Sequence, residues 1–216
     1  MRFSKTGDLV IDPMCGSGTT LGVARTLGRD AIGCDISEDL TKRVVQGLQQ
    51  TAQSQWGRTE VMSGNAASDL TVTRVAELMT TWGHESCAMQ IFHPPYHDII
   101  RFTDVPGDLS ACPTVDDFLI SLDHVFRRWL PLLRKGGIIG VVIGDLYASS
   151  AWVPLGFRVL ELLQSRDLGL SLRGIVVKNM TNSRGKRNMK NLWRYRSLQN
   201  DTFLFAHEYI LVLKKK

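Results

Sequence analysis

Long apolar runs are missing from this chain. The longest, IIGVVIG at residues 138–144, is far shorter than the roughly 20 residues that a membrane-spanning helix needs. The first ten residues, MRFSKTGDLV, also lack the apolar core of a secretory signal peptide. We therefore expect a cytoplasmic protein that makes no contact with a membrane.

Paired cysteines are missing as well. The four cysteines, Cys15, Cys34, Cys87 and Cys112, form no CxxC pair and have no metal-ligand spacing. Isolated thiols of this kind suit a reducing compartment better than a disulfide framework. We expect neither disulfides nor a metal site.

Acidic residues are absent from one stretch, Leu168 to Asn200, which contains eight basic residues. The whole chain has a formal net charge of +5, so the remainder is net negative. Clustered positive charge is typical of a surface that binds a polyanion, and aromatic rings beside arginines can stack on bases. A solvated loop in which basic residues cluster by chance is the alternative. The predicted nucleic-acid contacts are Lys178, Arg184, Lys186, Arg187, Lys190, Trp193, Arg194, Tyr195 and Arg196.

Short apolar runs alternate with amphipathic segments, which is typical of βαβ units and a mostly parallel sheet. We predict a single domain over residues 1–216, with no separate target-recognition domain. Its fold class is α/β, a doubly wound, mostly parallel seven-stranded sheet closed by a C-terminal antiparallel hairpin. Strands are expected over residues 8–13, 30–36, 60–66, 87–92, 136–145, 172–178 and 202–215. Helices are expected up to about residue 27 and over 38–53, 113–134 and 155–165, with Thr114 capping the third.

The stretch DPMCGSGTT lies where the first strand runs into the first helix. It is neither the GxGxxG of a dinucleotide site nor a phosphate loop, which would need a lysine. Gly16 and Gly18 allow a tight turn and a close approach to a ligand. Asp35, at the second strand end, is placed to hold ribose hydroxyls, and Asn65, after the third, to meet an adenine edge. Turn chemistry and capping would explain each feature alone, but three at successive strand ends favour a binding site.

Together with HPPY at residues 93–96, these features resemble the DNA amino-methyltransferases, which methylate adenine N6 or cytosine N4. DPMCGSGTT is similar to that family's cofactor loop, DPF-x-GSGTT, and HPPY to its catalytic (D/N/S)PPY. The resemblance extends over essentially the whole chain. It implies a Rossmann-like class I methyltransferase fold with S-adenosyl-L-methionine as the cofactor. By the resemblance, the cofactor contacts are Asp12, Pro13, Cys15, Gly16, Gly18, Thr19, Asp35, Ile36 and Asn65.

The tetrapeptide HPPY makes a stiff corner, because proline restricts φ and removes a backbone donor. An exocyclic amino nitrogen is a poor nucleophile, since its lone pair is delocalised into the base. Acceptors that hold its two N–H bonds favour attack on a sulfonium methyl, and a carbonyl at a rigid turn is fixed in advance. The resemblance implies that His93, Pro94, Pro95 and Tyr96 are catalytic. The Pro94 carbonyl and the His93 side chain would hold the amino group, while Tyr96 would stack on a flipped base.

Two features depart from the family. His93 stands where Asp, Asn or Ser is usual; a neutral imidazole offers one acceptor nitrogen and can take the released proton. The chain also begins only about ten residues before the cofactor loop. We therefore expect the segment that usually completes the methionine pocket to be absent, truncated or supplied by another part.

Double-stranded DNA is the predicted substrate, with adenine N6 favoured over cytosine N4 because N4 enzymes often have Ser at position 93. Target recognition is expected to fall to the loop from His97 to Cys112 and to the basic segment from Thr181 to Asn200. Either these loops enclose a short site, or a homodimer or a partner chain supplies the rest. One alternative is an RNA guanine-N2 or other amino-methyltransferase. Another is a non-catalytic nucleic-acid-binding subunit of a methyltransferase complex.

Reversing the charges of Arg184 and Lys186 to glutamate should weaken DNA binding and flatten its salt dependence, because fewer counterions would be released. Fluorescence anisotropy with a labelled duplex, repeated over a range of salt concentrations, measures both quantities. An unchanged slope would place the DNA-binding surface elsewhere.

Overall fold

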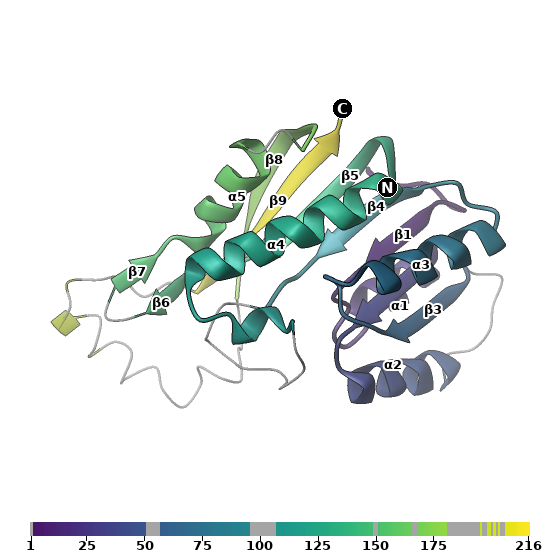
Figure 1. Cartoon of the computed structure of the whole chain (residues 1–216), viewed down its shortest axis with the longest axis horizontal. Coiled ribbons are helices and arrows are strands. Elements are labelled where there is room, and N and C mark those ends of the chain that lie inside the picture. Colours follow the sequence, from purple (N-terminus) through teal and green to yellow (C-terminus); the bar gives the residue numbers. More distant parts are fainter. Residues whose placement is uncertain are drawn as a thin grey trace.

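A seven-stranded sheet, in the order β3-β2-β1-β4-β5-β9-β8, organises the chain (Figure 1). The computed structural model describes residues 2–50, 57–95, 107–148, 151–165, 168–180 and 206–216, and the single residues 195, 198, 199, 201 and 203. β3, β2, β1, β4 and β5 are parallel, and β9 pairs antiparallel with both β5 and β8. The strands are β1 (Leu9–Asp12), β2 (Asp30–Asp35), β3 (Thr59–Ser63), β4 (Cys87–Phe92), β5 (Leu133–Ile143), β8 (Leu170–Asn179) and β9 (His207–Lys215). This is the predicted doubly wound sheet with its C-terminal antiparallel pair.

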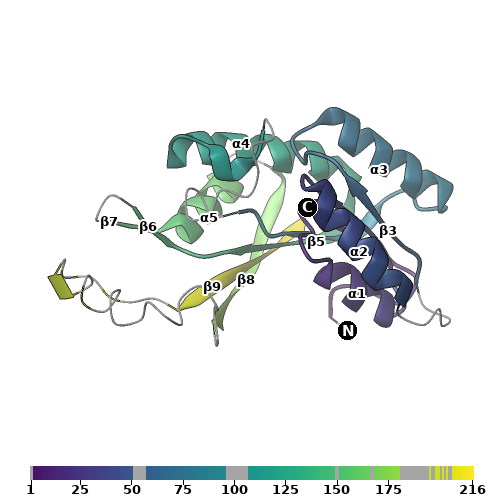
Figure 2. The same ribbon diagram turned by 90° about the horizontal axis from the view of Figure 1, so that it is seen from below.

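Helices cover the two faces of this sheet, as the turned view in Figure 2 shows. On one face lie α1 (Thr19–Thr26) and α2 (Glu38–Gln50). On the other lie α3 (Asp69–Thr81), α4 (Val115–Trp129) and α5 (Leu155–Ser165). Two short 3₁₀ helices, η1 (Leu109–Ala111) and η2 (Leu130–Leu132), flank α4, and a small antiparallel pair, β6 (Leu146–Ala148) and β7 (Ala151–Val153), follows β5. Within the described parts of the chain, no helix is long and apolar enough to cross a membrane.

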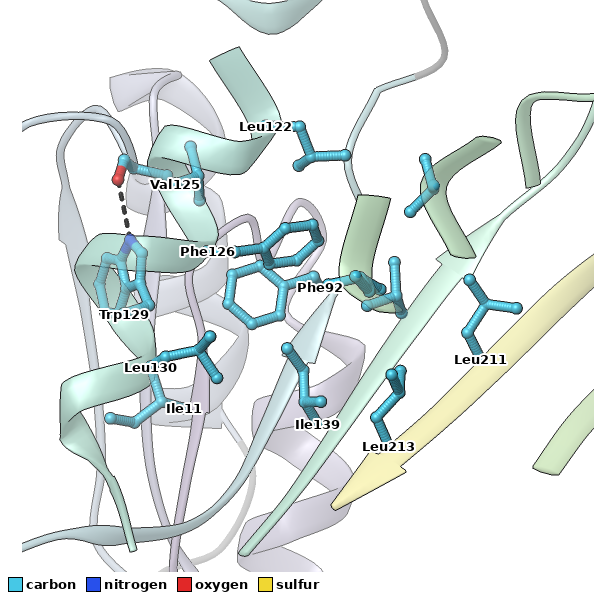
Figure 3. Packing of buried hydrophobic residues seen from close by; sticks show 14 of the residues in the cluster. Ile11, Phe92, Leu122, Val125, Phe126, Trp129, Leu130, Ile139, Leu211 and Leu213 are labelled. Atoms are coloured by element: carbon cyan, nitrogen blue, oxygen red, sulfur yellow. Dashed lines mark hydrogen bonds between the residues drawn. The ribbon is translucent and has the colours of Figure 1, made fainter. Parts of the chain in front are cut away.

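The larger hydrophobic core fills the space between the sheet and the helices α3, α4 and α5 (Figure 3). Phe92 of β4 meets Phe126 of α4 edge-on, with ring centroids 5.0 Å apart. Both rings and Trp129 are fully buried, so α4 is fixed by its aromatic face. A smaller cluster, which includes Leu21 of α1 and Val44 of α2, packs on the opposite face.

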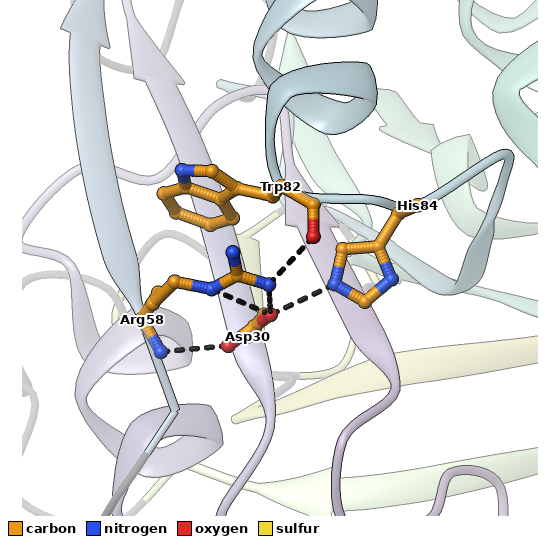
Figure 4. A network of polar contacts seen from close by, with 4 residues as sticks. All are labelled: Asp30, Arg58, Trp82 and His84. Carbon is orange, nitrogen blue, oxygen red and sulfur yellow. Dashed lines mark hydrogen bonds and ion pairs between the residues drawn. The ribbon is translucent and has the colours of Figure 1, made fainter.

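A buried carboxylate joins three elements at the edge of the sheet away from the carboxyl ends of the parallel strands (Figure 4). Asp30 of β2 accepts from the backbone N–H of Arg58 at 2.7 Å and from its Nε at 3.1 Å, and it lies 2.8 Å from His84 Nε2. Arg58 also lies over the ring of Trp82 and donates to its carbonyl oxygen. Burial alone would raise the pKa of Asp30, but the hydrogen bonds from Arg58 and His84 outweigh it and lower that pKa. This network ties β2 and β3 to the end of α3.

Most predicted elements are present, with shifted ends. β4 and α5 have the predicted bounds, and Thr114 caps α4 by accepting from the backbone N–H of Asp117 at 3.1 Å. The helix predicted over 113–134 is shorter: Pro131 lies in η2 and cannot continue the helical hydrogen bonds, and Leu133 already begins β5. β9 begins at residue 207 rather than 202, and residues 51–53 of the second predicted helix lie outside the described part.

Helix α3 was not predicted from the sequence. Its segment, DLTVTRVAELMTT, is rich in β-branched threonine and valine, which have low helix propensity. Val75 and Met79 are almost completely buried against the core. Tertiary packing therefore stabilises a helix that the local sequence does not favour. The short β6–β7 pair was also not predicted.

Gly156 lies in the first turn of α5, and the structure shows why glycine is required at this position. Its backbone N–H donates to Asp145 at 3.0 Å, and a Cβ added there would lie 2.4 Å from the ring of Tyr209. Tyr209 and Trp152 donate to the same buried carboxylate, each at 3.2 Å. Only glycine lets α5 approach β9 this closely.

We expect Gly156→Ala to lower the free energy of unfolding by about 1–3 kcal/mol, the usual range for overpacking a well-filled site. Urea unfolding followed by circular dichroism measures the change. Gly47→Ala is the matched control, because an added Cβ there meets nothing within 4 Å. Equal stabilities of the two variants would contradict the close packing at α5.

Candidate cofactor and catalytic site

The loop between β1 and α1 turns on two glycines with positive φ, Gly16 at 49° and Gly18 at 76°. Such angles are open to glycine and strained for other residues. The backbone N–H of Cys15 donates to the carbonyl of Cys34 on β2 at 2.8 Å, and Gly18 N–H donates back to the Cys15 carbonyl at 2.8 Å. The loop makes the tight turn that the glycines predicted, and its backbone is held against β2.

Asp35, the last residue of β2, organises the surrounding turns. Its Oδ2 accepts from the backbone N–H of Gly16 at 2.8 Å, and its Oδ1 accepts from that of Ser37 at 2.9 Å. Its own carbonyl accepts from Gly64 N–H, after β3, at 2.9 Å. Each carboxylate oxygen has further lone pairs, so this side chain can still accept from ribose hydroxyls as predicted.

Asp12, the last residue of β1, is a buried acid with a perturbed pKa. Only 3% of its surface is exposed, and its Oδ1 accepts from Met14 N–H at 3.2 Å. Burial, assisted by the nearby charge of Asp35, raises the pKa of Asp12 to about 6, although hydrogen bonds from Thr20 and Met14 oppose the shift. Within the described residues this carboxylate forms no ion pair, and a bound ammonium group would supply a positive charge.

The turn after β3 is fixed from two directions. Asn65 Oδ1 accepts from Ala67 N–H at 2.8 Å, and Trp129 Nε1 of α4 donates to the Ala66 carbonyl at 2.8 Å, the dashed line in Figure 3. Gly107 packs against Asn65: its φ is 87°, and an added Cβ would lie 2.3 Å from Asn65 Nδ2. Residues 107–109 therefore form a wall beside the predicted adenine contact.

One cavity of about 810 Å³ joins these strand ends to the proline corner. That volume is within the range of known ligand pockets. The cavity is lined by eight of the nine predicted cofactor contacts, Asp12, Pro13, Cys15, Gly16, Thr19, Asp35, Ile36 and Asn65, and by His93, Pro94, Pro95 and Lys178. Gly18 does not line it: a Cβ there would lie 2.5 Å from Val44, so this glycine lets α1 approach α2.

The proline corner begins directly after β4. Pro94 is buried, Pro95 is half-buried, and His93 is exposed at the cavity wall. Although part of the side chain reaches solvent, nearby protein atoms partly desolvate the imidazole and lower the pKa of His93; Glu208 raises it, and Lys178 lowers it. The lowered pKa favours the neutral imidazole, which can accept a hydrogen bond. Tyr96, the fourth predicted catalytic residue, lies outside the described part of the chain.

Two of the predicted nucleic-acid contacts are in the described part. Lys178 lines the cavity, and its Nζ donates to Glu208 Oε2 at 2.8 Å. Tyr195 is 60% exposed. The others lie outside the described residues: Arg184, Lys186, Arg187, Lys190, Trp193, Arg194 and Arg196.

Several lining residues were not identified from the sequence. Ser17, Ser37 and Leu40 follow the predicted contacts closely and could have been found by extending them. Asp108 and Val142 could not have been found in this way. Asp108 follows a stretch without a clear pattern, and the sequence around Val142 predicts only a strand. Asp108 is buried, and its Oδ1 accepts from both the N–H and the hydroxyl of Ser110.

Comparison with known proteins identifies chains of similar fold. Residues 1–46 match a family of N6/N4 enzymes described as DNA methylase. A SAM-dependent methyltransferase from Methanosarcina mazei is 13% identical, with 99% of this chain and 94% of that one covered and a TM-score of 0.60. TrmN from Thermus thermophilus is 18% identical, with 99% and 45% covered and a TM-score of 0.56. A putative rRNA methylase from Clostridium thermocellum is 17% identical, with 99% and 91% covered and a TM-score of 0.56. The fold is that of the class I methyltransferases.

Replacing Asp12 with asparagine should stabilise the free protein and weaken cofactor binding. The folded-state pKa is raised from 3.8 to about 6, so the ionised carboxylate destabilises the fold as pH rises through this window. The free energy of unfolding of Asp12→Asn should therefore exceed that of the parent by up to about 3 kcal/mol at pH 7.5 and match it near pH 4.

Thermal unfolding at the two pH values and calorimetric titration with S-adenosylmethionine test this expectation. Asp39→Asn is the matched control, since Asp39 is an exposed acid in the first turn of α2. Undiminished affinity of Asp12→Asn would remove Asp12 from the cofactor contacts.

Proposed function

We propose that this protein is an S-adenosylmethionine-dependent methyltransferase that acts on an exocyclic amino group of a nucleobase in DNA. The observation that carries the proposal is the shared cavity. It places the strand-end acids and Asn65 on one side and the Pro94–Pro95 corner with a neutral His93 on the other. A cofactor and an extruded base would meet there.

The residues present fit the cofactor. The buried Asp12 carboxylate suits the α-ammonium group, Asp35 keeps acceptor capacity for ribose hydroxyls, and Asn65 offers an amide to the adenine edge. At Gly16 an added Cβ would meet nothing within 4 Å, so the loop leaves open space there for a ligand. When bound, the cofactor supplies an electrophilic methyl group on sulfur.

The corner supplies the acceptors that make an amino group nucleophilic. Carbonyl oxygens at a stiff Pro-Pro turn are fixed before the reaction and need no reorganisation during it. The lowered pKa of His93 leaves the imidazole free of a proton near pH 7, so it can accept from the second N–H and then take the proton that leaves the nitrogen. Alignment of the two substrates in one cavity accounts for much of the rate enhancement.

DNA is favoured as the substrate by the match of residues 1–46 to the DNA methylase family. The basic stretch 168–200 supports a polyanionic substrate without separating DNA from RNA. RNA is the second candidate, because structures of similar fold include proteins described as rRNA methylases, from Clostridium thermocellum and Streptococcus thermophilus.

The test is an assay with tritiated S-adenosylmethionine, offering mixed-sequence duplex DNA and, separately, bulk RNA. We expect label in N6-methyladenine or N4-methylcytosine after the nucleosides are separated and identified by mass. Tyr96→Ala should lose transfer but keep cofactor binding, because Tyr96 would hold only the base. Label in RNA alone would replace DNA by RNA, and cofactor binding without label on either polymer would contradict the proposed substrates.

A further inference from the structure

The antiparallel pair of β8 and β9 brings an ion pair to the candidate site. Lys178 of β8 is the cross-strand partner of Glu208 of β9, and their side chains meet at 2.8 Å between Nζ and Oε2. Both residues lie near the strand ends that point toward the carboxyl edge of β5, since Tyr209 pairs with Ile143, the last residue of β5. The ion pair therefore lies at the edge of the sheet where His93 follows β4.

Strand alternation puts the ion pair on the same face of the sheet as the cavity. Val142 pairs with Ile210, and Glu208 lies two residues before Ile210, so both point to one face. Lys178 and Val142 both line the cavity together with His93. The wall of the cavity thus includes both the proline corner and Lys178, one member of the ion pair.

The two charges of this pair are unequally exposed. The Glu208 side chain is 9% exposed and that of Lys178 is 53% exposed. A buried carboxylate is costly unless a partner compensates it, and Lys178 provides that compensation. Both charges act on His93, with Lys178 disfavouring the imidazolium and Glu208 favouring it.

We propose that Lys178 and Glu208 are positioning residues that act through His93. Lys178 screens Glu208 so that the imidazole stays neutral while the amino group binds. Glu208 then provides the counter-charge when the imidazole receives a proton. This inference rests on the proposed function.

The ion pair acts at the step in which the amino nitrogen loses a proton to His93. The amino nitrogen forms a bond to the methyl carbon as the carbon–sulfur bond breaks, and the bonding electron pair stays on sulfur. The nitrogen then carries a positive charge and releases one N–H proton to the unprotonated ring nitrogen of His93. The products are a neutral methylamino group and an imidazolium, which returns its proton to water because His93 is exposed.

Three other acidic residues line the same cavity and are unchanged in the variants below. They are Asp12 and Asp35, at the ends of β1 and β2, and Asp108, beside η1. They form part of the negative surroundings in every variant considered below. Differences between variants of the ion pair therefore report on Lys178 and Glu208 alone.

The proposal predicts shifts of opposite sign. In Lys178→Met the charge that opposes Glu208 is removed, so Glu208 stabilises the imidazolium more strongly and the acid limb of the pH profile of kcat/KM moves to higher pH. In Glu208→Gln the imidazolium loses its counter-charge and faces Lys178, so the limb moves to lower pH. The double variant should fall between the two single variants. Shifts in the same direction, or none, would overturn the proposal.

Lys214→Met is the matched control. It removes the same charge from the same face of β9, six residues from Glu208 and roughly 20 Å away along the strand. Its acid limb should coincide with that of the parent. Thermal unfolding of each variant identifies any that fails to fold.

Repeating the ion-pair substitutions in a His93→Asn variant tests whether the pair acts through His93. In His93→Asn an acceptor remains but no imidazole titrates at this position, so Lys178→Met and Glu208→Gln should no longer displace the acid limb, and any titration that remains belongs to Asp12. Persistent displacement there would show that the pair acts elsewhere.

Proton NMR titration of His93 in the free protein separates this inference from the proposed function. The five histidines can be distinguished by the resonance that disappears in His93→Asn. The titration midpoint should rise in Lys178→Met and fall in Glu208→Gln, whether or not any polynucleotide is methylated. Reciprocal shifts without methyl transfer would refute the proposed function alone, and an unmoved midpoint would refute the role of the pair.

Discussion

The carboxylate of Asp35 is the interaction on which the site depends. It accepts one backbone N–H from the glycine loop and another from the turn that begins α2. Because backbone donors cannot be repositioned independently of the chain, these two bonds fix the loop and the turn relative to β2. Charge-assisted hydrogen bonds are also stronger than neutral ones. The Cys15–Cys34 backbone bond reinforces the same junction, so the glycine loop and the turn before α2 are both fixed relative to the end of β2.

The order of the strands explains why the cavity lies where it does. From β1 the chain proceeds outward to β2 and β3, and then returns to the other side of β1 with β4 and β5. A crevice opens at the carboxyl ends of the parallel strands where this reversal takes place. Asp12 ends β1 and His93 follows β4, so the two neighbouring strands on either side of the reversal supply the two functional halves of the cavity.

The two halves are built differently. The cofactor half is organised by backbone hydrogen bonds to carboxylate and amide side chains, which give it a fixed geometry. The catalytic half rests on buried aromatic packing, with Phe92 against Phe126 just before the corner, and on the charges of Lys178 and Glu208 beside it. Packing holds the start of the corner in position, while desolvation is the main cause that lowers the pKa of His93, with Glu208 and Lys178 acting in opposite directions.

The sequence alone determined the sheet, the glycine turn, the acids at two strand ends and the proline corner, because each depends on a few neighbouring residues. Positive φ at Gly16 and Gly18 and the cap at Thr114 are local effects of this kind. Only the tertiary structure decided the rest. α3 forms against its own propensity because the core buries one face of it, and Asp108 reaches the cavity through a segment without a pattern. Lys178 appeared to be one basic residue among eight, and the β8–β9 register paired it with an acid 30 positions away. Contacts between residues so distant in the chain depend on the register of the paired strands, and no local pattern encodes that register.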